Sequence, residues 1–185
     1  MAQKLPVFCI AAVASNRGIG KDRRLPWKLD GDLRMFSRLT KETRTPEKQN
    51  AVVMGRETWL SIPSRHRPLR DRVNVVLSRS LEEPPDGVRL YHGFQEAIDS
   101  LQSDECRDKI ETIWVVGGSS VYEAALCICD RIYLTHIEKE FDCDTFFPVF
   151  DTQLFQPASV DPRVPKDIKA ENDVSYRFCV YERQQ

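Results

Sequence analysis

The sequence lacks the cysteine and histidine patterns of metal-bound or disulfide-stabilised proteins. Its six cysteines form no CxxC pair and no Cys/His set with zinc-ligand spacing, and His66, His92 and His136 show no metal-like spacing either. We therefore expect no metal site and no disulfide framework. We interpret the cysteines as free thiols in a reducing compartment: Cys9, Cys106, Cys127, Cys129, Cys143 and Cys179.

An excess of charge of either sign is also missing. Lys and Arg contribute 27 residues against 28 Asp and Glu, the formal net charge is −1, and no Lys/Arg block resembles a nucleic-acid arm. The apolar run at 7–13 is too short to span a membrane, and residues 1–16 show no signal-peptide pattern. We expect a cytoplasmic protein with no membrane contact and no obligatory nucleic-acid partner.

No linker, internal repeat or low-complexity tract divides the chain. Its 185 residues fit one domain, and with 41% hydrophobic residues the chain can bury a substantial core without metal or disulfides. The sequence thus predicts a single domain over residues 1–185.

Short apolar segments alternate with helical patterns along most of the chain. Six segments are almost continuously apolar, as strands buried on both faces are: 7–13, 51–54, 73–78, 88–91, 113–116 and 131–137. Helical periodicity lies between them, at 30–43, 57–62, 94–103 and 119–127. This alternation predicts an α/β domain with a largely parallel sheet and helices on both of its faces.

The C-terminal part of the chain has a different pattern. After Asp151 no helical period appears, and residues 174–182 are aromatic and partly alternating, which predicts an added antiparallel strand near the edge of the sheet. Pro157, Pro162 and Pro165 precede this strand and predict an irregular connection.

A Gly-Gly turn follows the predicted strand 113–116 and precedes the predicted helix 119–127. Free N–H groups and the positive end of a helix dipole then lie beyond a strand's carboxyl end, where phosphates bind in α/β sheets. The alternative is an ordinary tight turn with Ser119 or Ser120 as the helix N-cap, and Gly-Gly alone favours that alternative. No GxGxxG follows the first strand, so a Rossmann dehydrogenase is disfavoured.

Two further features have a functional and a structural interpretation. The polar loop 15–27, which contains Gly18 and Gly20, is either a lid or a plain surface loop. Arg56 and Arg79 each follow a predicted strand, where their guanidinium groups would suit an extra phosphate such as the 2′-phosphate of NADPH. Surface arginines near strand ends are also common, so spacing alone leaves both interpretations open.

Asp32 is a carboxylate on the side of the helix 30–43 that should be buried. It lies one turn before Phe36 and next to Leu33, on the apolar face of this helix. The alternative is a solvent-exposed first-turn residue that favours the helix dipole, with Asp30 as N-cap.

Several motifs resemble, in order and spacing, those of the dihydrofolate reductase family: GIGKDRRLPW, the helix with Asp32, AVVMGRETW followed by SIP, RPLRDRVNVVLSR, IWVVGGSSVY and DTFFP. The resemblance covers essentially the whole chain. The insertion KETRTPEKQN and the proline-rich connections resemble eukaryotic members, and the length resembles a stand-alone reductase.

The resemblance implies a fold, a reaction and a catalytic centre. It implies a mixed sheet of about eight strands, NADPH across the strand ends, and reduction of 7,8-dihydrofolate to 5,6,7,8-tetrahydrofolate, with hydride transfer to pterin C6 and protonation at N5. It further implies a monomer, a role in one-carbon metabolism and inhibition by antifolates. Asp32 matches the carboxylate that binds the pterin ring, Thr135 the hydroxyl beside it and Trp27 an indole that helps order a water, and Leu25 belongs to the same catalytic set.

The resemblance also assigns binding residues. The substrate positions are Ile10, Asp32, Leu33, Phe36, Ser37, Ser61, Ile62, Leu69, Arg72, Val116 and Tyr122. The cofactor positions are Ala12, Gly18, Ile19, Gly20, Lys21, Gly55, Arg56, Glu57, Thr58, Ser78, Arg79, Ser80, His92, Gly117, Gly118, Ser119, Ser120, Val121 and Tyr122. Among these, Arg72 matches the arginine that receives the α-carboxylate of the glutamate tail, and the Gly117–Gly118 bond resembles the family's cis peptide.

A few positions depart from the family pattern. Asp32 replaces the Glu usual in vertebrate members, and Arg23 and Arg24 stand where small or acidic residues are frequent. Glu57 stands where a basic residue is common, and His92 lies in a shortened stretch near the expected 2′-phosphate. We expect these differences to affect lid motion and cofactor affinity and to leave the reaction unchanged.

Two other functions use the same pattern less well. The NADPH-dependent reductase of riboflavin synthesis resembles this fold, but it does not need Trp27, Asp32 and Arg72 together. A nucleotide-binding or RNA-binding regulatory protein on a degenerated reductase is disfavoured by the intact set of Asp32, Thr135 and the Gly-Gly turn. In the favoured reading Asp32 is too far from N5 for direct transfer, so its negative field raises the basicity of the bound ring and a water delivers the proton.

Overall fold

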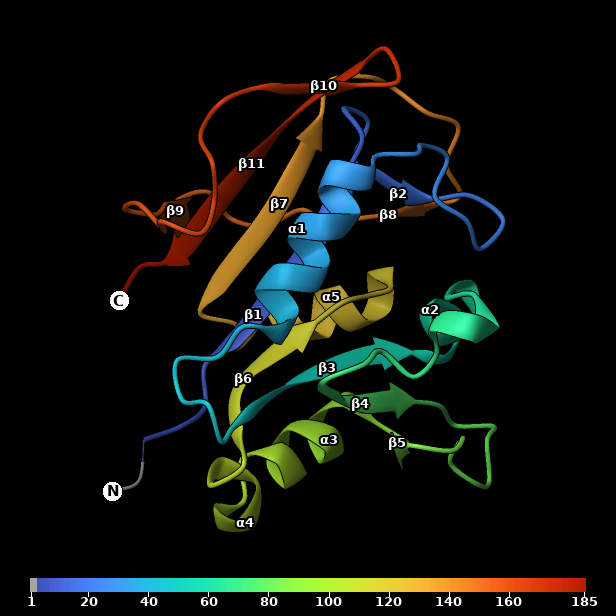
Figure 1. The fold of residues 1–185 in the computed structure, drawn as a ribbon, viewed down its shortest axis with the longest axis vertical. Helices are drawn as coiled ribbons and strands as arrows, with labels where there is room; N and C mark the ends of the chain where they lie inside the picture. Colours follow the sequence, from blue (N-terminus) through green and yellow to red (C-terminus); the bar gives the residue numbers. More distant parts are fainter. Residues whose placement is uncertain (1–2) are drawn as a thin grey trace.

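A mixed β-sheet runs through residues 3–185, which are the residues that this computed structural model describes (Figure 1). Its strands are β1 (Val7–Val13), β3 (Gln49–Gly55), β4 (Arg72–Leu77), β5 (Val88–Tyr91), β6 (Ile110–Val115), β7 (Arg131–Ile137), β9 (Phe155–Pro157), β10 (Lys169–Glu171) and β11 (Val174–Arg183). Their order is β10-β11-β7-β1-β6-β3-β4-β5, and β9 also pairs with β11. The pairs from β7 to β5 are parallel, whereas every pair that involves β11 is antiparallel. The predicted α/β class and the antiparallel C-terminal strand are thus confirmed.

The helices correspond to the periodic segments of the sequence. They are α1 (Asp30–Lys41), α2 (Arg56–Ser61), α3 (Phe94–Leu101), α4 (Asp104–Arg107) and α5 (Ser119–Leu126), with a short 3-10 turn at Ser64–His66. The helix α4 was not predicted, although Ser103 caps it in a recognisable way by accepting a bond from the Cys106 N–H.

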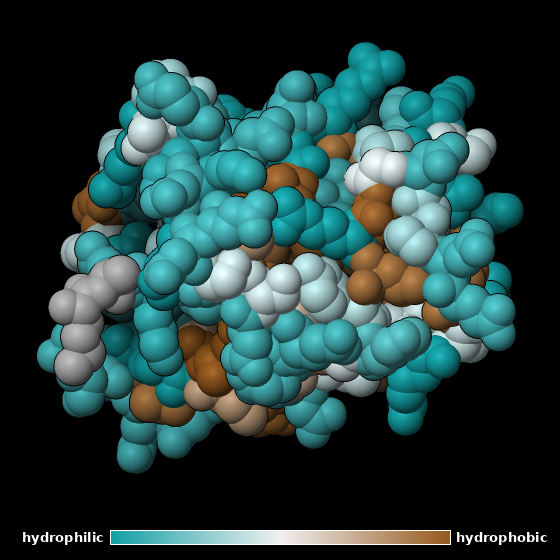
Figure 2. All heavy atoms as spheres, turned by 90° about the horizontal axis from the view of Figure 1, so that it is seen from below, coloured by the Kyte–Doolittle hydropathy of each residue, from teal (hydrophilic) through white to brown (hydrophobic). Residues whose placement is uncertain are grey.

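The central strands bury both of their faces. In β3, Ala51 and Val53 belong to the core on the side of α3 and α5, whereas Val52 and Met54 belong to the core on the side of α1 and α2. All four are 0% exposed. This explains the continuous apolar runs of the sequence, and it places the polar residues outside, where they cover most of the face seen in Figure 2.

The connection before β11 is less irregular than its prolines predict. Pro157 lies in β9, a short edge strand that pairs with β11 along one side. The next strand, β10, forms a hairpin with β11. The hairpin turn consists of Asn172 and Asp173, whose φ angles of 51° and 60° suit a two-residue hairpin loop. This Asn-Asp pair between two short segments was the available signal for β10. A second small sheet, β2 (Gly18–Gly20) with β8 (Thr145–Phe146), was also not predicted.

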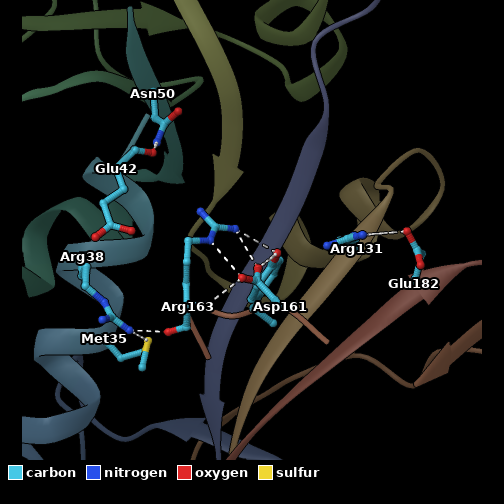
Figure 3. Close-up of polar contacts among 9 residues, drawn as sticks. Met35, Arg38, Glu42, Asn50, Arg131, Asp161, Arg163 and Glu182 are labelled. Carbon is cyan, nitrogen blue, oxygen red and sulfur yellow. Dashed lines mark hydrogen bonds and ion pairs between the residues drawn. The ribbon is translucent and has the colours of Figure 1, made fainter. Parts of the chain in front are cut away.

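An ionic cluster attaches the connection between β9 and β10 to the rest of the domain (Figure 3). The Arg163 guanidinium donates to both carboxylate oxygens of Asp161, at 3.1 and 2.8 Å, and the Tyr133 hydroxyl donates to Asp161 at 2.9 Å. Arg38 of α1 donates to the Arg163 carbonyl oxygen. Hydrogen bonds to its carboxylate hold the pKa of Asp161 at about 2 against the effect of burial, which raises it. The following residue, Val164, packs against the core cluster that contains Met35 and Leu39 of α1.

Three further features of the structure concern membrane-spanning helices, metal-binding groups and disulfides. None of the helices in residues 3–185 has the length and apolar character that a membrane crossing needs. In the same residues, no group of three or more His, Cys, Asp and Glu side chains is placed to hold a metal ion, and the six cysteines are unpaired.

A buried amide holds the turn that leads into β4. Asn74 is 2% exposed, and its Oδ1 accepts a bond from the Leu69 N–H at 2.9 Å. Its Nδ2 donates to the carbonyl oxygens of Leu69, at 2.8 Å, and Arg72, at 3.0 Å. The amide therefore satisfies three backbone groups of a segment whose residues belong to the predicted substrate site.

We expect Asn74→Leu to lower the free energy of unfolding by about 2–4 kcal/mol, because it leaves these backbone groups without partners in a buried place. Urea unfolding followed by circular dichroism measures this loss. Gln95→Ala is the control: this surface amide only bonds Asp99, and its loss should change stability by less than about 0.5 kcal/mol. A loss for Asn74→Leu no larger than that of the control would contradict the argument.

Candidate active site

A cavity of about 950 Å³ opens at the carboxyl ends of the parallel strands, between α1 and α2. Such strand ends are where ligands bind in open α/β sheets. The cavity wall contains more than half of the residues predicted from the sequence: Ile10, Ala12, Ile19, Gly20, Leu25, Asp32, Leu33, Phe36, Glu57, Thr58, Ser61, Ile62, Leu69, Val116, Gly117, Gly118, Tyr122 and Thr135. These residues come from segments far apart in the chain, and the fold brings them to one place.

The other predicted residues do not line this cavity. They are Gly18, Lys21, Trp27, Ser37, Gly55, Arg56, Arg72, Ser78, Arg79, Ser80, His92, Ser119, Ser120 and Val121. Several of them adjoin wall residues in the chain, so their binding roles stay predictions.

Asp32 is buried in the cavity wall, on the side of α1 that faces β7. It is 9% exposed, and the hydroxyl of Thr135 in β7 donates to its Oδ1 at 2.6 Å. Burial raises the pKa of Asp32 to about 6, the bond from Thr135 opposes this rise, and the negative charge of Glu171 adds to it. The prediction that Asp32 is buried beside Thr135 is confirmed, and the interpretation of Asp32 as a solvent-exposed residue is wrong.

The first turn of α1 is not capped by Asp30, as the alternative interpretation of Asp32 required. The N-cap position is Leu29, without a side-chain cap, and Asp30 is already inside the helix. Glu171 of β10 takes over the capping: its carboxylate accepts bonds from the N–H groups of Asp30, at 2.6 Å, and Gly31, at 3.1 Å. No local pattern reveals this cap, because its acceptor lies 140 residues further along the chain.

Trp27 lies just behind the cavity wall and is 7% exposed. Its ring packs against Phe141 at 5.3 Å between centroids. Its indole Nε1 is buried and has no hydrogen-bond partner among the described residues. A buried donor without a partner is uncommon and suits a bound water, which agrees with the role that the family resemblance implies for this indole.

The Gly-Gly turn joins β6 to α5 through a cis peptide between Gly117 and Gly118, as the family resemblance implied. Gly117 has φ 129°, and a Cβ there would lie 3.1 Å from the Thr58 hydroxyl oxygen, so the position strongly favours glycine. The N-cap of α5 is Gly118, without a side-chain cap. The alternative of a serine cap is therefore wrong, because the Ser119 hydroxyl bonds the backbone of Phe146 instead.

The two arginines at strand ends lie on adjacent strands. Arg56 directly follows β3 and Arg79 follows β4 by two residues, and the ends of these strands pair through Gly55 and Leu77. Beside them, the His92 ring Nδ1 lies 2.9 Å from the Ser78 carbonyl oxygen. The structure thus brings the two strand ends together.

The loop 15–27 reaches the opposite wall of the cavity through an ion pair. Arg23 contacts the carboxylate of Glu57, at the start of α2, and both residues line the cavity. Asp22 and Arg23 have φ angles of 49° and 60°, so the loop turns sharply where it forms this contact. Both members of the pair are departures from the family pattern, and the structure shows that they balance one another.

The end of the cavity nearest β4 carries the predicted tail site. Leu69, Ile62 and Ser61 lie in the wall, whereas Arg72 stands behind it. The Arg72 guanidinium donates to the Thr40 hydroxyl at 2.9 Å and to the Arg70 carbonyl oxygen at 2.8 Å. Burial lowers its pKa, as it disfavours the charged form.

Several wall residues were missed by sequence reasoning, among them Arg65, His66, Tyr133, Val164 and Phe178. Tyr133 had a usable signal, because it lies two residues before Thr135 and therefore on the same face of β7. Val164 and Phe178 come from the C-terminal part, whose position over the cavity depends on the antiparallel pairing of β11 with β7.

A sheet with a large cavity at its strand ends and a buried acid in the cavity wall is the arrangement of an α/β enzyme. A family model described as dihydrofolate reductase matches residues 6–183. The chain belongs to the dihydrofolate reductase family, whose members are oxidoreductases, and the resemblance seen in its motifs is confirmed.

Relatives of this family match almost the whole chain. It is 44% identical over 182 residues to the dihydrofolate reductase of Sus scrofa, which covers 96% of this chain and 98% of that protein. It is 44% identical over 180 residues to the enzyme of Heliothis virescens, with 94% and 95% covered. The structure matches Schistosoma mansoni dihydrofolate reductase with a TM-score of 0.87 and 38% identity, covering 98% of this chain and 100% of that chain.

The burial of Asp32 predicts a pH-dependent effect on stability. A pKa raised from 3.8 to about 6 favours folding below pH 4, and this contribution is lost as the pH rises through 6. We therefore expect Asp32→Asn, which can still accept the bond from Thr135, to be more stable than the wild type at pH 8 by about 1–3 kcal/mol. Urea unfolding of the ligand-free protein at pH 8 and pH 4 measures this difference. The same difference at both values would contradict the argument.

Proposed function

We propose that the protein reduces 7,8-dihydrofolate to 5,6,7,8-tetrahydrofolate with NADPH, and so supplies the tetrahydrofolate of one-carbon metabolism. The observation that carries this proposal is the buried Asp32, held by Thr135 in the wall of the cavity. The bound cofactor supplies the hydride for pterin C6, and a proton is added at N5, so that the C6=N5 bond is reduced.

Asp32 fixes the orientation of the pterin in this proposal. A carboxylate accepts two parallel bonds from the amidine-like edge of such a ring. Because Thr135 uses one site on Oδ1, acceptor capacity remains on both oxygens. The flat ring then lies between apolar side chains of the wall, among them Leu33 and Phe36 of α1 and Val116 after β6. This arrangement supplies the proximity part of catalysis.

Asp32 also influences the proton at N5. Its pKa of about 6 in the ligand-free protein means that it is mainly ionised at neutral pH, and the ionised form raises the basicity of a bound ring. The free N–H of Trp27 is a suitable donor to a water near this acid. We infer that the proton reaches N5 through water under the influence of Asp32, a contribution of roughly 10²- to 10⁴-fold in rate.

The residues at the Gly-Gly turn and the adjacent strand ends fit a dinucleotide. A Cβ at Gly117 would crowd Thr58, and one at Gly55 would lie 3.4 Å from Val121, so glycine leaves backbone exposed where a nucleotide can approach. Arg56 and Arg79, on neighbouring strand ends, would hold the 2′-phosphate that distinguishes NADPH from NADH.

The remaining parts of the proposal concern the tail and the setting. Arg72 receives the α-carboxylate of the substrate's glutamate tail, and Ser61, Ile62 and Leu69 line the tail's path. We further propose a cytoplasmic monomer that antifolates inhibit. The free cysteines agree with a reducing compartment.

Oxidation of NADPH with dihydrofolate as the sole acceptor tests the function directly. We expect rapid loss of NADPH absorbance without any nucleic acid, and its suppression by a diaminopyrimidine inhibitor. In the same assay Asp32→Asn should lose roughly 10²-fold or more in kcat at pH 7 and regain part of it in acid, where the substrate brings its own proton. Unchanged turnover of this variant would refute the role of Asp32, and no turnover of the wild type would refute the function.

Cofactor choice is tested by binding. We expect Arg79→Gln to raise the Kd of NADPH by roughly 10- to 100-fold, the value of a charge-assisted hydrogen bond, and to leave that of NADH within about twofold. Tryptophan fluorescence titrations measure both constants. Arg177→Gln removes the same charge from an exposed site on β11 and should change neither. Equal weakening of both cofactors by Arg79→Gln would contradict the assignment of the 2′-phosphate.

A further inference from the structure

The hairpin of β10 and β11 contacts the residues that lead into α1 (Figure 1). The Glu171 carboxylate accepts from the N–H groups of Asp30, at 2.6 Å, and Gly31, at 3.1 Å, and the Tyr176 hydroxyl donates to the same carboxylate at 3.2 Å. The neighbouring Asn172 donates to the Lys28 carbonyl oxygen at 2.7 Å. Two adjacent residues of the hairpin thus hold residues 28–31, immediately before Asp32.

Helix α1 has no other cap at this end. No side chain of its own segment satisfies the first N–H groups, which a helix leaves without backbone partners. A carboxylate in that position also interacts favourably with the positive end of the helix dipole. Glu171 therefore fixes the start of the helix that carries the acid of the cavity.

Gly31 makes this close approach possible. A Cβ at this position would lie 2.2 Å from the Tyr176 hydroxyl oxygen and 3.3 Å from Glu171 Oε2. Any larger residue would push the tyrosine and the carboxylate away from the helix. The glycine, the tyrosine and the glutamate are therefore parts of one contact.

We propose that Glu171 is a positioning residue for the reductase reaction, which fixes the first turn of α1 and sets the electrostatic field at Asp32. The inference rests on the proposed function of Asp32. Glu171 does not line the cavity, so it acts on the substrate only through Asp32.

The charges around Asp32 support this role. The groups that interact with it are Glu171 of β10, Tyr176 of β11 and Tyr122 of α5, while Thr135 of β7 is neutral and Arg34 of α1 acts on Glu171 and Tyr176. Burial raises the pKa of both tyrosines, so they stay neutral. Glu171 is therefore the negative charge that adds to the rise in the pKa of Asp32.

Glu171 itself stays ionised in the pH range in which Asp32 titrates. The N–H bonds from Gly31 and Asp30 lower its pKa, because they favour the charged form. The same contact that caps the helix thus keeps the charge in place. Loss of the charge should lower the pKa of Asp32, and loss of the contact should do so as well.

Glu171→Gln tests the inference, because it removes the charge and keeps the shape. In the ligand-free protein, the pKa of Asp32 is measured from the pH dependence of its ¹³Cγ chemical shift, assigned with Asp32→Asn. We expect this pKa to fall by about half a unit or more, and the pH profile of kcat/KM for dihydrofolate to move in the same direction. Glu171→Asp keeps the charge and should restore most of the wild-type value.

Glu182→Gln is the matched control. It removes the same charge from the far end of β11, where Glu182 pairs with Arg131 at 2.9 Å, and it should leave the pKa of Asp32 in place. An unchanged pKa in Glu171→Gln, or an equal shift in the control, would overturn the inference. A shifted pKa with an unchanged pH profile would instead overturn the proposed function of Asp32 and, with it, the catalytic meaning of Glu171.

Gly31→Ala disturbs the same contact from the side of the helix. It is the variant to measure if Glu171→Gln does not fold. Alanine favours the helix, so folding is not put at risk by propensity. The added Cβ must displace Tyr176 and the carboxylate, and the pKa of Asp32 should fall. A wild-type pKa in this variant would likewise overturn the inference.

Discussion

The hydrogen bond from the Thr135 hydroxyl to the Asp32 carboxylate joins β7 to α1 across 103 residues of sequence. It gives a partner to a carboxyl group that burial would otherwise leave unpaired at considerable cost. The compensation is partial, because the pKa of Asp32 still lies at about 6. The parallel pairing of β7 with β1 positions the hydroxyl, and packing of Met35 and Leu39 against the sheet positions the carboxylate. The cavity is built around this pair.

Two ion pairs fix segments that border the cavity. Arg23 of the loop meets Glu57 of α2, and Arg163 meets Asp161 in the connection that bears Val164. Seen in the sequence alone, Arg23 and Glu57 were two separate departures from the family pattern. In the structure they form one ion pair, and Glu57 also lies 3.8 Å from the Arg56 guanidinium.

The sequence was a good guide wherever one segment carries its own signal. The two-sided strands, the apolar face of α1 with Asp32, and the Gly-Gly turn all have short patterns, and all lie where those patterns predicted. The helix caps considered as alternatives at Asp30 and Ser119 do not form, because the local rule assumes that the residues at a helix start satisfy its free N–H groups. Here a carboxylate of β10 caps α1, and the Ser119 hydroxyl bonds the backbone of Phe146 in β8.

The sequence by itself determined the α/β class, the family and the chemistry of the principal acid, because periodicity, ordered motifs and residue type are properties of the chain. Only the tertiary structure decided that Tyr133, Val164 and Phe178 complete the cavity wall, and that Glu171 faces the first turn of α1. The contact between Glu171 and Gly31, for example, joins residues that are 140 positions apart in the sequence. Such contacts depend on the order of the strands and on the pairing of β11 with both β7 and β10, which involves several segments and which no single segment specifies.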